Sequence, residues 1–258
     1  MIGASQDVVV AIAANLARVR GRIAAACARA GRDPNAVTLV AVTKTRSSDE
    51  MRAAYACGVR HMGENRVEEA EDKVPALQAA LRAEFAAEPV TWHLIGHIQS
   101  RKAARAAALG DVIHSVDSVR LAQRLERCAA EAARRISVLL EMNVSGEASK
   151  FGLAAWDAAS RAALLDELAP LAEMRHLQVR GLMTMAPIVP DPEQARPVFR
   201  ALRELADFLR PRLAFSAWSE LSMGMTDDFE VAIEEGATLV RIGRAIFEAP
   251  TCAQEDQP

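Results

Sequence analysis

One lysine stands where its amine could do covalent chemistry. Lys44 directly follows VTLVAVT (37–43), an apolar run rich in β-branched residues that predicts a strand buried on both faces. Burial lowers the pKa of a lysine, and the cation of Arg46 nearby would lower it further. A neutral amine at this place can attack an aldehyde and form a Schiff base. The alternative is a lysine that extends to solvent or pairs with Glu64.

Two glycine-containing turns supply groups that bind a phosphate. In SMGMT and in the RIGR turn near the C-terminus, Gly224 and Gly243 would let backbone N–H groups approach an anion. Ser222 and Thr226 offer hydroxyls, and a helix beginning near Arg244 would direct its N-terminus at the same anion. The alternative is that both glycines only make tight turns between strand and helix.

The sequence predicts no metal site. His93 and His97 are four residues apart, but Gly96 breaks the helix that such a pair needs, and there is no HExxH motif. His93 is therefore interpreted as a hydrogen-bonded core histidine. The four cysteines are far apart without a CxxC pair, which indicates reduced thiols: Cys27, Cys57, Cys128 and Cys252.

The order of apolar segments predicts a single (β/α)8 TIM barrel with an extra N-terminal helix. That first helix has apolar residues at spacings of three and four from Ile12 to Cys27 and ends by Gly31. An open doubly wound sheet is the competing fold, but no GxGxxG follows the first strand. We expect one domain over 1–248 and a disordered tail over 249–258. The strands are predicted at 37–43, 59–63, 91–95, 112–116, 136–144, 179–184, 214–221 and 239–242, and the helices between them at 48–57, 65–87, 99–109, 118–134, 154–175, 191–210 and 227–236.

The residues that could take part in binding or catalysis fall at one place in each strand–helix unit. Lys44, Asn65 and Arg66 follow early strands, and the two glycine turns follow the last two. These positions are the C-terminal ends of strands, which is the face on which barrel enzymes build their sites. Asn65 and Arg66 could bind a substrate there, or could cap the helix that follows.

Charge and hydropathy exclude several classes of protein. The 258 residues carry a formal net charge of −3, so we expect no binding to nucleic acid or to anionic lipid. No apolar stretch is long enough to predict a transmembrane helix, and no basic segment precedes the first apolar one as in a signal peptide. We expect a cytoplasmic protein without contact to a membrane.

Taken together, the motifs resemble the YggS/PROSC family, the pyridoxal phosphate homeostasis proteins. The resemblance runs from about residue 8 to residue 248, with seven motifs in the family's order. They are LVAVTKTRS, GVRHMGENRVEE, WHLIGHIQSRK, IHSVDS, NVSGEASKFGL, VRGLMTMAP and ELSMGMTDDFEVAIEEGATLVRIGRAIF.

The resemblance implies a barrel of the alanine racemase N-terminal type that binds pyridoxal 5′-phosphate. It implies a Schiff base on Lys44 and an arginine, Arg241, that faces the pyridine nitrogen. It further implies that Asn65 and Met183 line the cofactor pocket. The phosphate contacts would come from Ser222, Gly224, Gly243 and Arg244.

Three positions depart from the family pattern. Arg244 stands where the family has threonine, so a hydroxyl contact to phosphate is lost there while the backbone N–H remains. Arg46 replaces a second lysine of many members, and Glu248 replaces a glycine after IF. A secondary cofactor site is the feature that these changes put in question.

Two functions are compatible with this resemblance. The favoured one is a non-catalytic carrier, expected to be a monomer, that holds pyridoxal phosphate and buffers it. We expect it to supply the cofactor by transient contact with pyridoxal phosphate-dependent apoenzymes. The alternative is a pyridoxal phosphate-dependent amino-acid racemase or related enzyme. Racemisation needs an acid or base on each face of the substrate carbon, and the related racemases bring a tyrosine from the partner subunit. This chain has one tyrosine, Tyr55, in an early predicted helix.

Overall fold

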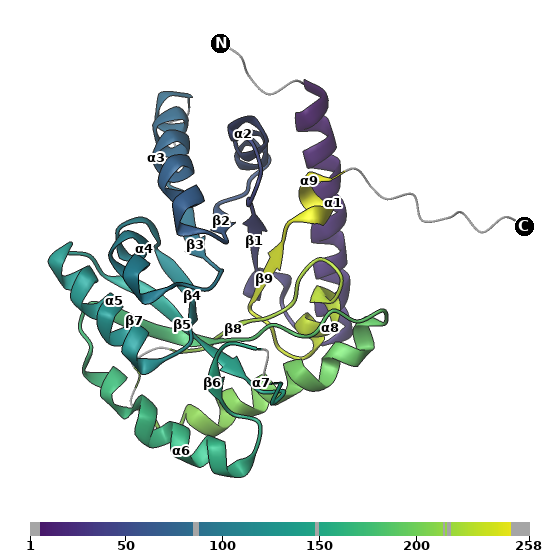
Figure 1. The fold of residues 1–258 in the computed structure, drawn as a ribbon. Helices are drawn as coiled ribbons and strands as arrows, with labels where there is room; N and C mark the ends of the chain where they lie inside the picture. Colours follow the sequence, from purple (N-terminus) through teal and green to yellow (C-terminus); the bar gives the residue numbers. More distant parts are fainter. Residues whose placement is uncertain (1–5, 85–87, 148–149, 214, 216–217, 249–258) are drawn as a thin grey trace, which may run out of the picture.

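The computed structural model describes residues 6–84, 88–147, 150–213, 215 and 218–248. Over these residues the chain alternates strands and helices, and the strands lie around a central axis with the helices outside them (Figure 1). The tail expected over 249–258 lies outside the described residues.

Eight parallel strands form a closed barrel, as predicted. Neighbours along the chain pair throughout, and the ring closes because the first strand also pairs with the last, with Val40 opposite Arg241. A short additional strand, Leu153–Ala154 (β6), pairs with the edge of one barrel strand and was not predicted. The barrel strands are β1 (Thr38–Val42), β2 (His61–Glu64), β3 (Thr91–Leu94), β4 (Val112–Val116), β5 (Ile136–Asn143), β7 (Leu177–Met183), β8 (Glu220–Ser222) and β9 (Leu239–Ile242).

Helices cover the outside of the barrel. The predicted N-terminal helix is present as α1, and its buried residues include the predicted apolar set from Ile12 to Cys27. Within the described residues, no helix combines the length and the apolar character that crossing a membrane requires. The α-helices are α1 (Gln6–Arg29), α2 (Ser48–Ala56), α3 (Val67–Glu84), α4 (Ala103–Leu109), α5 (Val119–Glu131), α6 (Ala158–Leu168), α7 (Arg196–Leu209), α8 (Phe229–Glu234) and α9 (Arg244–Phe247).

Two predicted elements were placed wrongly. The strand expected over 214–221 is only Glu220–Ser222, and residues 214, 216 and 217 lie outside the described part. The helix expected over 154–175 is interrupted: α6 ends at Leu168 and a 3₁₀ segment, Ala169–Glu173, follows it. Pro170 explains this interruption, because proline lacks the N–H that a continuing helix would use.

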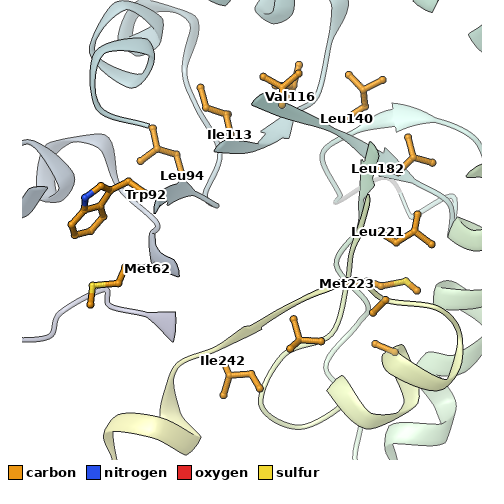
Figure 2. Packing of buried hydrophobic residues seen from close by; sticks show 14 of the residues in the cluster. Met62, Trp92, Leu94, Ile113, Val116, Leu140, Leu182, Leu221, Met223 and Ile242 are labelled. Carbon is orange, nitrogen blue, oxygen red and sulfur yellow. The ribbon is translucent and has the colours of Figure 1, made fainter. Parts of the chain in front are cut away.

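The two faces of the barrel strands have different surroundings. Figure 2 shows that large apolar side chains point outward from the ring of strands, where they form the main core with the helices. Inside the ring there is a much smaller apolar cluster of Val40, Leu139, Met183 and Leu239. Because successive side chains on a strand alternate in direction, the remaining inward positions are open to polar residues. The outward residues labelled in Figure 2 are Met62, Trp92, Leu94, Ile113, Val116, Leu140, Leu182, Leu221, Met223 and Ile242.

Cysteines in the described residues are free thiols, as the sequence predicts. Cys27 is buried in α1, and Cys57 and Cys128 are partly buried at the ends of helices. Burial raises the pKa of the Cys27 thiol, so it stays protonated near neutral pH. Cys252 lies outside the described residues.

We predict that Gly181→Ala destabilises the barrel by about 1–3 kcal/mol or more. A Cβ at Gly181 on β7 would lie 1.8 Å from the backbone oxygen of Glu220 on β8, so these paired strands would have to separate. The matched control is Gly21→Ala on the exposed side of α1, where a Cβ meets nothing within 4 Å. That variant should gain about 1 kcal/mol from helix propensity. Urea unfolding measures both, and equal stabilities would contradict the prediction.

Candidate functional site

The predicted site residues gather at the C-terminal rim of the barrel. Lys44 follows β1, Asn65 follows β2, and Gly243 follows β9, and these three strands are neighbours in the ring. Met183 ends β7, opposite Ser222 at the end of β8. The rim therefore brings together residues that are up to about two hundred positions apart in the sequence.

The backbone on both sides of Lys44 is held from α3. The carbonyl of Thr43 accepts a hydrogen bond from Lys73 Nζ at 2.7 Å, and the N–H of Thr45 donates to Glu69 Oε1 at 2.5 Å. Thr45 has φ +63°, a left-handed conformation that costs energy in a residue other than glycine. Two fixed peptide groups thus determine where the Lys44 side chain begins.

Lys44 itself is exposed, and its ammonium has no hydrogen-bond or ion-pair partner among the described residues. The alternative of a Lys44–Glu64 pair is wrong. Glu64 is fully buried, accepts from Thr43 Oγ1 at 2.6 Å and pairs with Lys73 at 3.2 Å. Burial raises the pKa of Glu64, and Thr43 and Lys73 oppose that rise.

The three departures from the family pattern are all engaged in surface ion pairs. Arg46 pairs with Glu248 at 2.8 Å, so two of the departing residues contact each other. Arg244 pairs with Asp227, and both side chains are largely exposed. Such exposed pairs contribute about 1 kcal/mol or less to stability. Each pair does, however, place a carboxylate beside the guanidinium, which offsets the positive charge of Arg46 and of Arg244 next to the rim.

Arg241 is a buried cation inside the barrel. Its side chain is on β9 and the residue is 4% exposed. It donates one hydrogen bond to Ser222 Oγ and one to the carbonyl of Thr184 at 3.1 Å. Burial lowers the pKa of Arg241 to about 10, while Asp228 and Glu141 act in the opposite direction. Near neutral pH the guanidinium therefore stays charged and can only donate.

Glu220, on the neighbouring strand β8, has a partner other than Arg241. Glu220 pairs with Arg180 at 2.7 Å, and both of those side chains are only partly buried. A guanidinium has more N–H groups than the two bonds to Ser222 and Thr184 use. Arg241 consequently retains donors for a ligand.

Ser222 ends β8 at the rim, but its hydroxyl is directed into the barrel interior. It is fully buried, and its hydroxyl contacts Arg241 and His114 Nδ1, the latter at 2.8 Å. The sequence predicts a phosphate contact for this hydroxyl, which in the described structure is engaged by these two side chains. Thr226, four residues later, is partly exposed in the turn that follows Gly224.

The glycines of both turns have close neighbours. Gly224 has φ +91°, and a Cβ there would lie 2.6 Å from Ala232 Cβ. A Cβ on Gly243 would lie 3.3 Å from the carbonyl oxygen of Val42. After Gly243 the predicted helix is present as α9, but it has only four residues. It supplies N–H groups without helical partners, and too short a run of peptides for a large helix dipole.

Histidines near the site contact neighbouring side chains through hydrogen bonds, an ion pair and ring stacking. His93 is buried and contacts another histidine through each ring nitrogen, as expected of a core histidine. His97 pairs with Asp117 at 3.1 Å and stacks on Phe151, far from the arrangement of a metal pair. Over the part of the chain that the structure describes, no group of three potential ligands could bind a metal ion.

Sequence reasoning missed three residues around Arg241: His114, Glu141 and Thr184. All three are buried, on β4, on β5 and just after β7. Burial raises the pKa of Glu141 to about 7, with Asp117 adding to the rise and Arg241 opposing it. Strand alternation offers a signal for Glu141, a polar residue at an inward position between the outward apolar residues Leu140 and Met142. It offers none for His114, which is followed by the polar Ser115 where the register of β4 shifts.

Comparison with known proteins identifies the class of this barrel. The family model for the alanine racemase N-terminal domain matches residues 11–250. The pyridoxal phosphate homeostasis protein of Pseudomonas aeruginosa is 42% identical over 242 residues, which cover 92% of this chain and 95% of that protein.

Solved structures agree with this. PipY of Synechococcus elongatus PCC7942, solved with PLP bound, is 37% identical with a TM-score of 0.74, covering 92% of this chain and 99% of that one. A protein of unknown function from Bifidobacterium adolescentis is 38% identical with a TM-score of 0.84, covering 94% and 97%. The barrel is thus of the alanine racemase N-terminal type. The chain belongs to the pyridoxal phosphate homeostasis protein family.

We predict that Glu141→Gln becomes more stable, relative to the wild type, as pH rises. The pKa of Glu141 is 4.5 ordinarily and about 7 in the folded protein, so between these values the folded state binds more protons than the unfolded state. Wild-type stability therefore falls with pH in that window, by about 3 kcal/mol at most. The Gln variant lacks this fall.

Urea unfolding at several pH values between 4.5 and 8 measures the difference. The free energy of unfolding of the Gln variant minus that of the wild type should grow up to about pH 7 and then remain level. A difference that is constant with pH would contradict the raised pKa.

Proposed function

We propose that the protein binds pyridoxal 5′-phosphate and serves in its homeostasis as a carrier. The observation that supports this most is the rim itself, where an exposed amine, a buried guanidinium and two glycine turns come from β1, β9 and β8. These groups match an aldehyde, a ring nitrogen and a phosphate. Membership of the family and the PLP-bound relative PipY support the same ligand.

Lys44 is the residue we assign to covalent binding. Pyridoxal phosphate supplies an aldehyde, and a neutral lysine amine can attack its carbon with loss of water to give a C=N bond. Lys73 and Glu69 fix the peptide groups around Lys44, while its ammonium has no partner in the described structure. The amine is therefore accessible and its origin is fixed, as covalent capture requires.

Arg241 is assigned to the ring nitrogen. A guanidinium can only donate, and its charge opposes a second positive charge within about 4–6 Å. A ring nitrogen next to Arg241 would thus stay unprotonated, which weakens the cofactor as an electron acceptor. Asn65 after β2 and Met183 at the end of β7, each two strands from β9 in the ring, are assigned to the walls of the pocket.

The phosphate is assigned to the two glycine turns. Gly224, Gly243 and the backbone of Arg244 supply N–H groups, and Thr226 supplies the hydroxyl in place of Ser222, whose hydroxyl is held inside the barrel. Arg244 pairs with Asp227, so its side chain is not required for this role.

A carrier is favoured over a racemase. Tyr55 lies in α2 and donates its hydroxyl to the carbonyl of Glu88 at 2.8 Å, so it cannot serve as a second base at the rim. With Arg241 at the ring nitrogen and Tyr55 away from the rim, a racemase would lack both the protonated ring that stabilises a carbanion and the second base. We further propose that the protein acts in the cytoplasm as a monomer and passes the cofactor to apoenzymes by transient contact.

We predict that borohydride reduction of the cofactor-loaded protein places the adduct on Lys44. Peptide mass mapping locates it. Lys44→Ala should lose the adduct and keep its unfolding midpoint, because an exposed side chain contributes little packing. The matched controls are Lys102→Ala and Lys150→Ala, which remove lysines paired with Glu68 and Glu147. An adduct that remains in the Lys44→Ala variant, or that maps to Lys102 or Lys150 in the wild type, would refute the assignment.

We predict that Gly243→Asp weakens binding of pyridoxal phosphate at least 100-fold, whereas Gly243→Asn weakens it far less. The two side chains have nearly the same shape, so their difference isolates the repulsion between a carboxylate and the phosphate. Fluorescence titration with pyridoxal phosphate and with pyridoxal measures both effects. If wild type binds pyridoxal as tightly as pyridoxal phosphate, there is no phosphate site at these turns.

A further inference from the structure

Three imidazoles and a hydroxyl form a continuous row through the barrel interior. His61 Nδ1 lies 3.0 Å from His93 Nε2, and His93 Nδ1 lies 2.8 Å from His114 Nε2. His114 Nδ1 lies 2.8 Å from Ser222 Oγ, which in turn contacts the guanidinium of Arg241. The row starts on β2, passes β3 and β4, and crosses the barrel to β8 and β9.

The inner histidines are neutral near neutral pH. His93 and His114 are at most 1% exposed. Burial lowers the pKa of His93 to about 3, and burial together with His93 and Arg241 lowers the pKa of His114 well below its ordinary value. Burial also lowers the pKa of His61, which is partly exposed at the far end of the row. A neutral imidazole has one donor nitrogen and one acceptor nitrogen.

Arg241 determines the direction of every hydrogen bond in the row. Its guanidinium can only donate, so Ser222 Oγ accepts from it. In the described structure Ser222 Oγ has one other partner, His114 Nδ1, and a buried O–H without an acceptor is costly. Ser222 therefore donates to His114, which must be protonated at Nε2 and donate to His93.

The requirement that each hydrogen bond join one donor to one acceptor also fixes the tautomers of His93 and His61. His93 accepts at Nδ1, is protonated at Nε2 and donates to His61 Nδ1. All three rings are then Nε2–H tautomers, and no two donors or two acceptors face each other. Because a guanidinium does not give up its proton in ordinary conditions, the row ends at Arg241 and cannot deliver a proton through it.

We propose that His114, acting through Ser222, is a positioning residue for Arg241, and that His93 and His61 fix His114 in the tautomer this role requires. Ser222 presents an acceptor to Arg241, and the hydrogen bond that it donates to His114 holds its hydroxyl in one orientation. Glu141 and Asp228 stabilise the charge of Arg241, but its hydrogen bonds in the described structure go to Ser222 and Thr184. The functional consequence rests on the proposed function, in which Arg241 contacts the cofactor ring.

The first test uses the wild-type protein without cofactor. Long-range ¹H–¹⁵N NMR spectra of histidine side chains distinguish the two neutral tautomers and the imidazolium. We expect His61, His93 and His114 all as neutral Nε2–H rings at pH 7.5. A His114 ring protonated at Nδ1, or at both nitrogens, would overturn the proposal whether or not the protein binds pyridoxal phosphate.

The second test uses a pair of variants. His114→Gln can keep the polarity of the row, because its carbonyl oxygen can accept from Ser222 while its amide donates to His93. His114→Leu removes both bonds. Pyridoxal phosphate titrations should show at least tenfold weaker binding for the Leu variant and a shifted absorbance maximum of the bound cofactor, with the Gln variant within about threefold of wild type in affinity and unshifted.

The outcomes separate the two proposals. If wild type binds no pyridoxal phosphate while its tautomers are as expected, the proposed function fails and the role of the row in cofactor binding fails with it. If wild type binds and the Leu variant, folded by circular dichroism, binds equally with an unshifted maximum, only the positioning role fails. If the Leu variant does not fold, the Gln variant decides: a wild-type maximum supports the proposal, and a shifted one contradicts it.

Discussion

A buried guanidinium is the constraint on which the inside of this barrel depends. A charge away from water is costly unless it is paired and hydrogen-bonded, and Arg241 is only 4% exposed. Its neighbours meet that requirement in different ways: Glu141 and Asp228 by charge, Ser222 and the carbonyl of Thr184 by hydrogen bonds. Polar side chains therefore surround Arg241 inside the barrel, beside the small apolar cluster of Val40, Leu139, Met183 and Leu239.

The two faces of the barrel strands have different roles: one stabilises the fold and the other forms the site. Their outward side chains form the large apolar core with the helices (Figure 2). Inward side chains surround Arg241. The rim then adds Lys44, whose flanking peptide groups are held by Lys73 and Glu69 from α3. An accessible amine and a buried cation thus lie on adjacent strands, β1 and β9, with independent supports. This separation allows the site to carry strain at Thr45 without loss of the fold.

The sequence was sufficient for the fold and for the rim, because both follow from local patterns. Apolar strands alternate with amphipathic helices, and each chemical motif directly follows a strand. The strand expected over 214–221 was too long, since Phe215 and Trp218, the described apolar residues before Glu220, belong to no strand. The direction of Ser222 and the pairs of Glu64 with Lys73 and Glu220 with Arg180 were not predictable. They depend on which strand neighbours which across the ring, and no local pattern contains that information.

The most direct test of the account is a crystal structure of the protein with pyridoxal phosphate. The account predicts continuous density from Lys44 Nζ to the cofactor, its ring nitrogen within hydrogen-bonding distance of Arg241, and its phosphate between the turns of Gly224 and Gly243. Density instead in the groove bordered by Arg18, Arg22 and Arg244, or a ring whose nitrogen faces away from Arg241, would contradict it.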